Sequence, residues 1–340
     1  MRLAALFALL LLSTAPATSQ AAPAPAERIE IPIYQTRFSN GVIRYWIRVG
    51  IDGAAPVEVM LDTGSVGMHL LPGAQPHAAP HGRPVRASYG SGVELIGEAA
   101  PTELTLDPRI KVTAEVDWTR EARCIEERPE CPARDVPIAD YRIGGGPRRG
   151  FQAILGIGTR RGAADNPLAR TATGAWIVVL PAPDDTGPGK LIVNATPADR
   201  ERFAVQVRLQ RQAAQGDYWW DNTIPVCLSR DDQPPLCGPA MLDTGAPNLR
   251  FTSDKEPDQA AWPDGARVTL AYGPADHPAL RQTFVVGKGP GARVEFGRKM
   301  RAATWAGLNA GALPFQGLAV YYDVKQGVIG LTPRETFAVP

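Results

Sequence analysis

Two stretches of the sequence decide the fold: Val57-Glu-Val-Met-Leu-Asp-Thr-Gly-Ser65 and Ala240-Met-Leu-Asp-Thr-Gly-Ala246. Each is a short apolar strand that runs directly into an Asp-Thr-Gly tripeptide. An earlier segment, residues 44–53 or 221–227, predicts the strand that pairs with each of them across a turn. The second aspartate follows the first by 181 positions (243 − 62), so the same plan occurs once in each half. This pattern indicates a divergent internal duplication.

The repeated tripeptide carries a chemical meaning. One Asp-Thr-Gly arises by chance in roughly a tenth of chains this long, but two after apolar strands are expected on the order of once in a few hundred. Gly allows a tight bend, and the Thr hydroxyl can bond across to the partner loop. Two such loops face to face would hold Asp62 and Asp243 in contact. Carboxyls this close share a proton, so one serves as acid and the other as base. The alternative, that each Asp only caps a turn, is common for single sites.

Composition narrows the class of protein. The 36 basic and 35 acidic side chains nearly cancel, so no global field attracts nucleic acid or an anionic membrane, although local patches are not excluded. Gly and Pro occupy 34 and 33 positions, and strand patterns recur between them, which favours an all-β fold with short helices. The only helical patterns are short pieces near residues 197–203.

The N-terminus predicts export. Residues 1–21 combine a basic start, a short apolar run and small residues, which is typical of a signal peptide cleaved after Ala21 or Ala22. We therefore expect a periplasmic or extracellular protein, and no later segment is apolar enough to span a membrane.

The four cysteines form two close pairs, and in an exported chain these pairs predict two local disulfides. Buried free thiols are the alternative, and the spacing disfavours zinc. The two pairs are Cys124 with Cys131 and Cys227 with Cys237.

The domain division follows from the duplication. Residues 181–189 are rich in Pro, Gly and Asp without periodicity, which indicates a linker. We expect an N-terminal lobe at 27–180, with the first Asp-Thr-Gly, and a C-terminal lobe at 190–340, with the second.

With these motifs in order, the chain resembles the pepsin-like family of bilobal aspartic proteases over nearly its whole mature length. Tyr89-Gly90-Ser91-Gly92 resembles the flap that closes over substrate, and residues 150–158 resemble the segment that supports the first catalytic loop. Residues 320–333 resemble the family's C-terminal hairpin. The resemblance implies two related β-barrel-like lobes with the active-site cleft between them.

The resemblance also assigns residues. Asp62 and Asp243 would be catalytic, and the flap residues Tyr89, Gly90 and Ser91 would contact substrate. The loops around the two aspartates would be supported by Thr63, Gly64, Ser65, Thr244 and Gly245.

The chain departs from the family pattern at several positions. Ala246 stands where a hydroxyl would bond the outer oxygen of Asp243, so we expect a raised pKa for the pair and a less acidic optimum. His69 replaces a Trp that bonds the flap tyrosine, and it is either a flap partner or a packing residue. Residues 309–311 read Asn-Ala-Gly where two large apolar residues and Gly are usual. The family's inhibitory prosegment has no room before the first strand, as in a bacterial-type secreted member.

The function expected from this reasoning is an aspartic endopeptidase that binds peptide or protein substrates in extended form. We expect it to act as a monomer, without metal, cofactor, nucleic acid or membrane span. The alternative is a catalytically silent relative that serves as a binding or inhibitor module. A serine hydrolase is disfavoured because the sequence has no G-x-S-x-G elbow.

Overall fold

The computed structural model describes residues 26–146, 148–212, 216–231, 233–274, 276–300 and 305–337. The predicted signal peptide, residues 1–21, lies outside these ranges. The described chain is mainly β with short helices, which confirms the all-β class predicted from the sequence. Within the described ranges, no helix has the length and apolar character needed to cross a bilayer.

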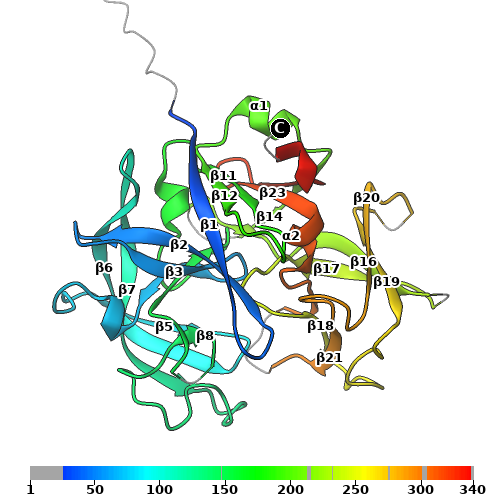
Figure 1. Cartoon of the computed structure of the whole chain (residues 1–340), viewed down its shortest axis with the longest axis horizontal. Coiled ribbons are helices and arrows are strands. Elements are labelled where there is room, and N and C mark those ends of the chain that lie inside the picture. The colour runs from blue at the N-terminus through cyan, green and yellow to red at the C-terminus, as the bar shows by residue number, and fades with distance from the viewer. Residues whose placement is uncertain are drawn as a thin grey trace, which may run out of the picture.

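Thirteen strands form the larger sheet, in the order β13-β24-β23-β11-β12-β1-β2-β3-β10-β4-β7-β6-β5. Strands from the C-terminal end belong to this sheet, since β23 pairs with β11 and β24 pairs with β13. In Figure 1, β2, β3 and β5 to β7 lie to the left and β11, β12 and β23 lie near the centre. The strands are β1 (Ile29–Arg37), β2 (Ile43–Ile51), β3 (Val57–Asp62), β4 (Val66–Leu70), β5 (Arg83–Ser88), β6 (Val93–Asp107), β7 (Ile110–Cys124), β10 (Ala153–Ile157), β11 (Ala175–Val179), β12 (Gly189–Val193), β13 (Val205–Arg208), β23 (Leu318–Asp323) and β24 (Val328–Pro333).

A second sheet has seven strands, in the order β20-β19-β16-β17-β22-β18-β21, and lies to the right in Figure 1. Its strands are β16 (Ile224–Arg230), β17 (Leu236–Met241), β18 (Leu249–Ser253), β19 (Arg267–Tyr272), β20 (Leu280–Val285), β21 (Val294–Arg298) and β22 (Gly307–Asn309). Two further pairs are β8 (Ile143–Gly144) with β9 (Gly150–Phe151), and β14 (Gln210–Arg211) with β15 (Trp219–Trp220).

The helical elements are single turns. They are α1 (Pro197–Glu201), α2 (Leu313–Gly317) and the 3-10 turns η1 (Pro72–Ala74), η2 (Pro167–Arg170) and η3 (Arg334–Phe337). Helix α1 lies where the sequence predicted a short helix, and a capping box explains its start. Thr196 and Asp199 exchange side-chain and backbone hydrogen bonds, and Pro197 occupies the first turn.

The hydrophobic core continues from one sheet to the other. Strands alternate between buried and partly exposed residues, as β6 shows. Trp176 on β11 stacks on Tyr322 on β23, with ring centroids 5.5 Å apart, and both rings are fully buried. A separate apolar cluster, which includes Trp46, Phe151 and Ile154, lies beneath Tyr89. These clusters fix the strands that carry the two Asp-Thr-Gly loops.

Each Asp-Thr-Gly loop is built on the same three-strand unit. Strand β10 runs parallel to β3 and antiparallel to β4, so it fills the space between the two strands that flank the first loop. Strand β22 does the same between β17 and β18 around the second loop. The hairpins β2–β3 and β16–β17 that the sequence predicted are both present. The repeated unit supports the inference of an internal duplication.

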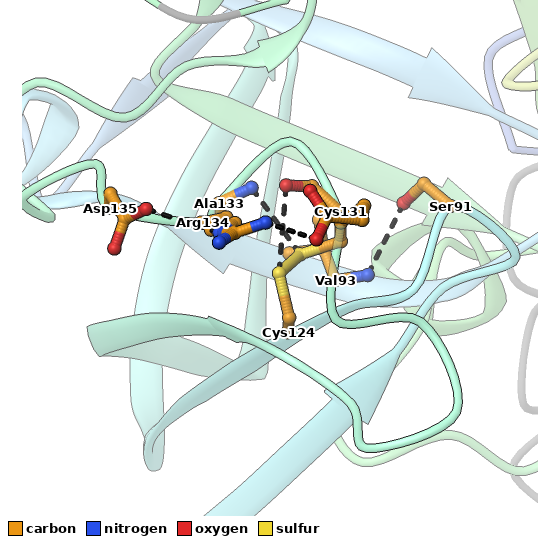
Figure 2. The surroundings of a disulfide bond; sticks show 8 residues. Ser91, Val93, Cys124, Cys131, Ala133, Arg134 and Asp135 are labelled. Carbon is orange, nitrogen blue, oxygen red and sulfur yellow. Dashed lines mark hydrogen bonds and ion pairs between the residues drawn. A yellow bond between two sulfur atoms is a disulfide. The ribbon is translucent and has the colours of Figure 1, made fainter.

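Both predicted disulfides are formed, and the described residues include no free cysteine, so the alternative of free thiols is wrong. Cys227 and Cys237 are opposite each other on β16 and β17. Cys124 and Cys131 close a loop after β7, beside Ser91 and Val93 (Figure 2). The backbone N–H of Ile125 in this loop donates to Gly92 O at 2.9 Å. The first disulfide loop is therefore attached to the predicted flap.

Candidate active site

The two Asp-Thr-Gly loops meet through crossed hydrogen bonds between their threonines. Thr63 Oγ1 donates to Leu242 O at 2.8 Å and accepts the Thr244 N–H at 3.0 Å. Thr244 Oγ1 donates to Leu61 O at 2.8 Å and accepts the Thr63 N–H at 3.0 Å. Both threonines are buried. Each loop thus satisfies backbone groups of the other, and their relative position is fixed without solvent.

The glycines of the loops bring the carboxyls together. A Cβ placed on Gly64 would lie 2.1 Å from Cγ of Asp243, and one on Gly245 would lie 2.6 Å from Cγ of Asp62. No side chain other than hydrogen fits at either position. Asp62 and Asp243 are 5% and 8% exposed, so both are largely removed from water.

Two donors in its own loop, together with burial and the charge of Asp243, decide the protonation state of Asp62. Its Oδ1 accepts the Gly64 N–H at 2.8 Å, and its Oδ2 accepts the Ser65 hydroxyl at 2.7 Å. Burial, followed by the charge of Asp243, raises the pKa of Asp62 to about 7, although the bonds from Ser65 and Gly64 oppose that rise. A carboxyl with this pKa carries its proton in mildly acidic solution.

Asp243 receives a donor that the sequence reasoning missed. Its Oδ1 accepts the N–H groups of Gly245 at 2.8 Å and Ala246 at 3.0 Å. Its Oδ2 accepts from Asn309 Nδ2 at 2.6 Å. The amide is oriented by its own oxygen, which accepts the Gly311 N–H at 3.0 Å. The expectation that Ala246 leaves the outer oxygen of Asp243 without a donor is therefore wrong.

Strand register explains why Asn309 reaches the carboxyl. Met60 and Met241 each lie two residues before the Asp of their loop, and they pair with Ile154 and Asn309 respectively. Asn309 thus occupies the position that Ile154 has in the first unit. Aligning the two copies through Gly156 and Gly311 would have shown a polar residue replacing an apolar one where Ala246 replaces Ser65.

Arg160 connects the first Asp-Thr-Gly loop to residues of the second half of the chain. It lies just after β10, where its Nη2 donates to Gly64 O at 2.8 Å and its Nη1 contacts Met241 Sδ at 3.3 Å. The guanidinium is held by an ion pair with Asp221, which also accepts the Thr159 N–H at 2.6 Å. Burial raises the pKa of Asp221, and the charge of Arg160 opposes the rise. This buried pair links the first loop to the strand that leads into the second.

A cleft of about 810 Å³ lies over the two carboxyls. The predicted flap forms one wall, because β5 and β6 make a hairpin whose turn is closed by the Gly92 N–H donating to Tyr89 O at 2.9 Å. Tyr89, Gly90 and Ser91 all line the cleft. The Tyr89 ring is half-buried, and burial raises the pKa of its hydroxyl. The cleft is therefore bordered by the three residues that the sequence analysis expected at the flap.

His69 lies beside the flap tyrosine without bonding it. Its Nδ1 is 2.8 Å from Oδ2 of Asp117, which also accepts the Thr119 hydroxyl at 2.9 Å. The ring contacts Tyr89 edge to face, with centroids 6.2 Å apart, but neither His69 Nε2 nor the Tyr89 hydroxyl has a hydrogen-bond partner among the described residues. The hydrogen bond considered for this pair is therefore not formed.

His77 and His81 belong to a loop, and His77 Nε2 lies 3.0 Å from Asp52. In the described part of the chain, no group of three His, Cys, Asp or Glu side chains is placed to hold a metal ion. A comparison with models of known protein families and a comparison with curated proteins both found no match.

Proposed function

We propose that this protein is a pepsin-like aspartic endopeptidase with two lobes, divided near residues 181–189, and that Asp62 and Asp243 form its catalytic pair. The observation that carries the proposal is the meeting of the two Asp-Thr-Gly loops, in which each carboxyl lies against the glycine of the other loop. The pair lies at a cleft of about 810 Å³ bordered by the Tyr89 hairpin, and this cleft would hold the substrate. These features support acid–base hydrolysis of a peptide bond.

The hydrogen bonds suggest how the two carboxyls divide the work. The Asn309 Nδ2 group, which faces Asp243, can only donate, so it favours an ionised Asp243. The Ser65 hydroxyl both donates and accepts, so it tolerates a protonated Asp62. In the proposed reaction Asp243 takes a proton from the attacking water, and Asp62 donates its proton to the carbonyl oxygen of the substrate. The tetrahedral diol collapses when Asp243 gives its new proton to the leaving amine and the C–N bond breaks, while a hydroxyl of the diol returns a proton to Asp62.

The test is cleavage of an unfolded protein across the mildly acidic range, with and without a statine-type inhibitor. The wild-type chain should be active and inhibited, whereas Asp62→Asn and Asp243→Asn should each lower kcat by about a thousandfold or more. Asp258→Asn, an exposed aspartate outside the cleft, is the matched control and should keep full activity.

A folded wild-type chain with no activity on any unfolded protein would favour the silent binding module instead. Activity that survives Asp62→Asn, or that the inhibitor leaves unchanged, would contradict the proposed chemistry.

A further inference from the structure

The cleft differs from the rest of the molecule in charge. The whole chain has 36 basic and 35 acidic side chains, yet nine basic and three acidic side chains line the cleft. Two of the three acids are the Asp62–Asp243 pair, which shares a proton under the proposed function. The cleft is therefore a local cationic surface on a nearly neutral protein, and its field favours an anionic occupant.

Several of these cations have no carboxylate partner within the described residues. Arg44 is buried at the cleft floor, where its Nε donates to Gly144 O at 2.9 Å and its Nη1 has no partner there. Burial lowers the pKa of Arg44, and the charges of Asp243 and Asp62 oppose this effect. The side chains of Arg161 and Arg298 line the cleft without a hydrogen bond or ion pair to any described residue. Arg161 and Arg298 are exposed, whereas Arg44 is buried, and a buried charge without a full set of partners is costly unless a counter-charge is supplied.

Arg128 and Arg250 line the cleft from different parts of the chain. Arg128 lies in the disulfide loop after β7, where Gly92 of the flap packs against its side chain. Arg250 belongs to β18 and packs over Gly297. Burial and then the charge of Arg250 lower the pKa of Arg128, while Glu127 acts in the opposite sense. Two like charges therefore line the same cleft, one from the disulfide loop beside the flap and one from β18.

Arg250 also has an N–H donor that is not used within the described residues. Its Nη1 lies 3.4 Å from Glu295, a long contact between half-exposed groups, and its buried Nε has no partner among the described residues. An arginine fork with an unused donor suits a carboxylate, which accepts two N–H bonds at once. A carboxylate between Arg128 and Arg250 would also relieve their mutual repulsion.

We propose that the cleft selects acidic peptides and that a glutamate or aspartate side chain of the substrate binds between Arg128 and Arg250. The inference rests on the proposed function for the use of the cleft, and it adds the class of substrate. The position of Arg128 beside the flap implies that the acidic residue is held where the flap closes over the peptide.

Binding on an inactive chain tests this without depending on turnover. Short fluorescent peptides that differ only by Glu or Gln at one position are titrated into Asp62→Asn at about pH 6, where Glu is ionised. We expect the Glu peptide to bind about tenfold more tightly at its best position, and added salt should reduce the ratio. Arg250→Met and Arg128→Met should each bring the ratio close to one, while Arg281→Met, an exposed residue outside the cleft, should not.

The design separates the two proposals. Equal binding of Glu and Gln peptides at every position, or a Glu preference that both arginine variants retain, would overturn the acidic-peptide inference even if the wild-type chain cleaves protein. Inactivity of the wild-type chain together with a preference lost in Arg250→Met would overturn only the proposed catalysis. Peptides with an amidated C-terminus distinguish a side-chain carboxylate from a terminal one, because the preference should survive amidation. Melting curves of both variants confirm that they fold.

Discussion

Asp62 and Asp243 obtain their outermost hydrogen bond from different parts of the chain. At Asp62 the donor is Ser65, three residues later in the same loop, and the support strand offers the apolar Ile154. At Asp243 the loop offers Ala246, and the support strand offers the donor Asn309. Both carboxyls have this bond, but the donor is a loop residue in the first unit and a support-strand residue in the second. The two loops therefore share the same hydrogen bond to the outer carboxyl oxygen, although the residues that provide it differ.

The crossed hydrogen bonds of the two threonines are the most symmetric feature of the two loops. Removing them should have the largest effect on stability. Thr63→Val or Thr244→Val would leave one buried carbonyl and one buried N–H without partners. Each variant should lose about 2–5 kcal/mol in free energy of unfolding, and the two losses should be similar. Urea unfolding measures both, with Thr269→Val on β19 as the control. Losses that differ severalfold would show that the two loops are not equivalent.

The pH dependence of stability separates the two carboxyls next. The pKa of Asp62 is about 7 in the folded chain and about 4 in an unfolded one. Between these values the folded state holds a proton that the unfolded state has lost, so stability should fall as pH rises through this window. Asp62→Asn should remove this fall. Asp243→Asn should remove the part of this fall that is due to the charge of Asp243 and keep the part that is due to the burial of Asp62. Melting temperatures across the window give the result, and a parallel profile for Asp62→Asn would contradict it.

Moving the hydrogen-bond donor of Asp243 from the support strand to the loop tests whether the two donors are equivalent. Asn309→Leu removes a bond that favours the ionised carboxyl, so the acid limb of kcat/KM should move up by about one pH unit. Adding Ala246→Ser to this variant places a hydroxyl in the loop, as at Ser65, and should return the limb towards its original position. Ala246→Ser alone is the matched control. An acid limb unmoved by Asn309→Leu would mean that the amide has no influence on the pair.

Ser65→Ala should have the smallest effect, and its effect should appear on the other limb. The Ser65 hydroxyl lowers the pKa of Asp62, so its loss should raise that pKa further and move the alkaline limb up by about half a unit. Thermal melting shows whether the variant remains folded. Movement of the acid limb in this variant would reverse the assignment of acid and base.

Much of the fold and of the candidate site follows from local sequence. The paired hairpins, the Asp-Thr-Gly turns, the short helix at 197–201 and both disulfides involve residues that are close in the chain. Their chemistry is therefore fixed by neighbouring residues. The crossed threonine bonds could be anticipated because the tripeptide occurs twice.

The parts that the sequence reasoning missed depend on register between distant strands. Asn309 reaches Asp243 only because β22 pairs with β17 in one particular register. Asp117 lies beside His69 because β4 and β7 pair in parallel. The cationic cleft combines Arg44, Arg128 and Arg250 from three separate segments. A single sequence does not show which distant residues lie together. The nearly neutral composition therefore did not predict a cationic cleft.

The reciprocal bonds of Thr63 and Thr244 also bear on when the chain could become active. Neither half can complete its own turn, because each needs a backbone carbonyl and a hydroxyl from the other. A nascent or half-folded polypeptide would therefore have aspartates but no shared proton between them. In the proposed enzyme, hydrolytic capacity would appear only at the last step of assembly, which would protect the cell that makes it from premature digestion.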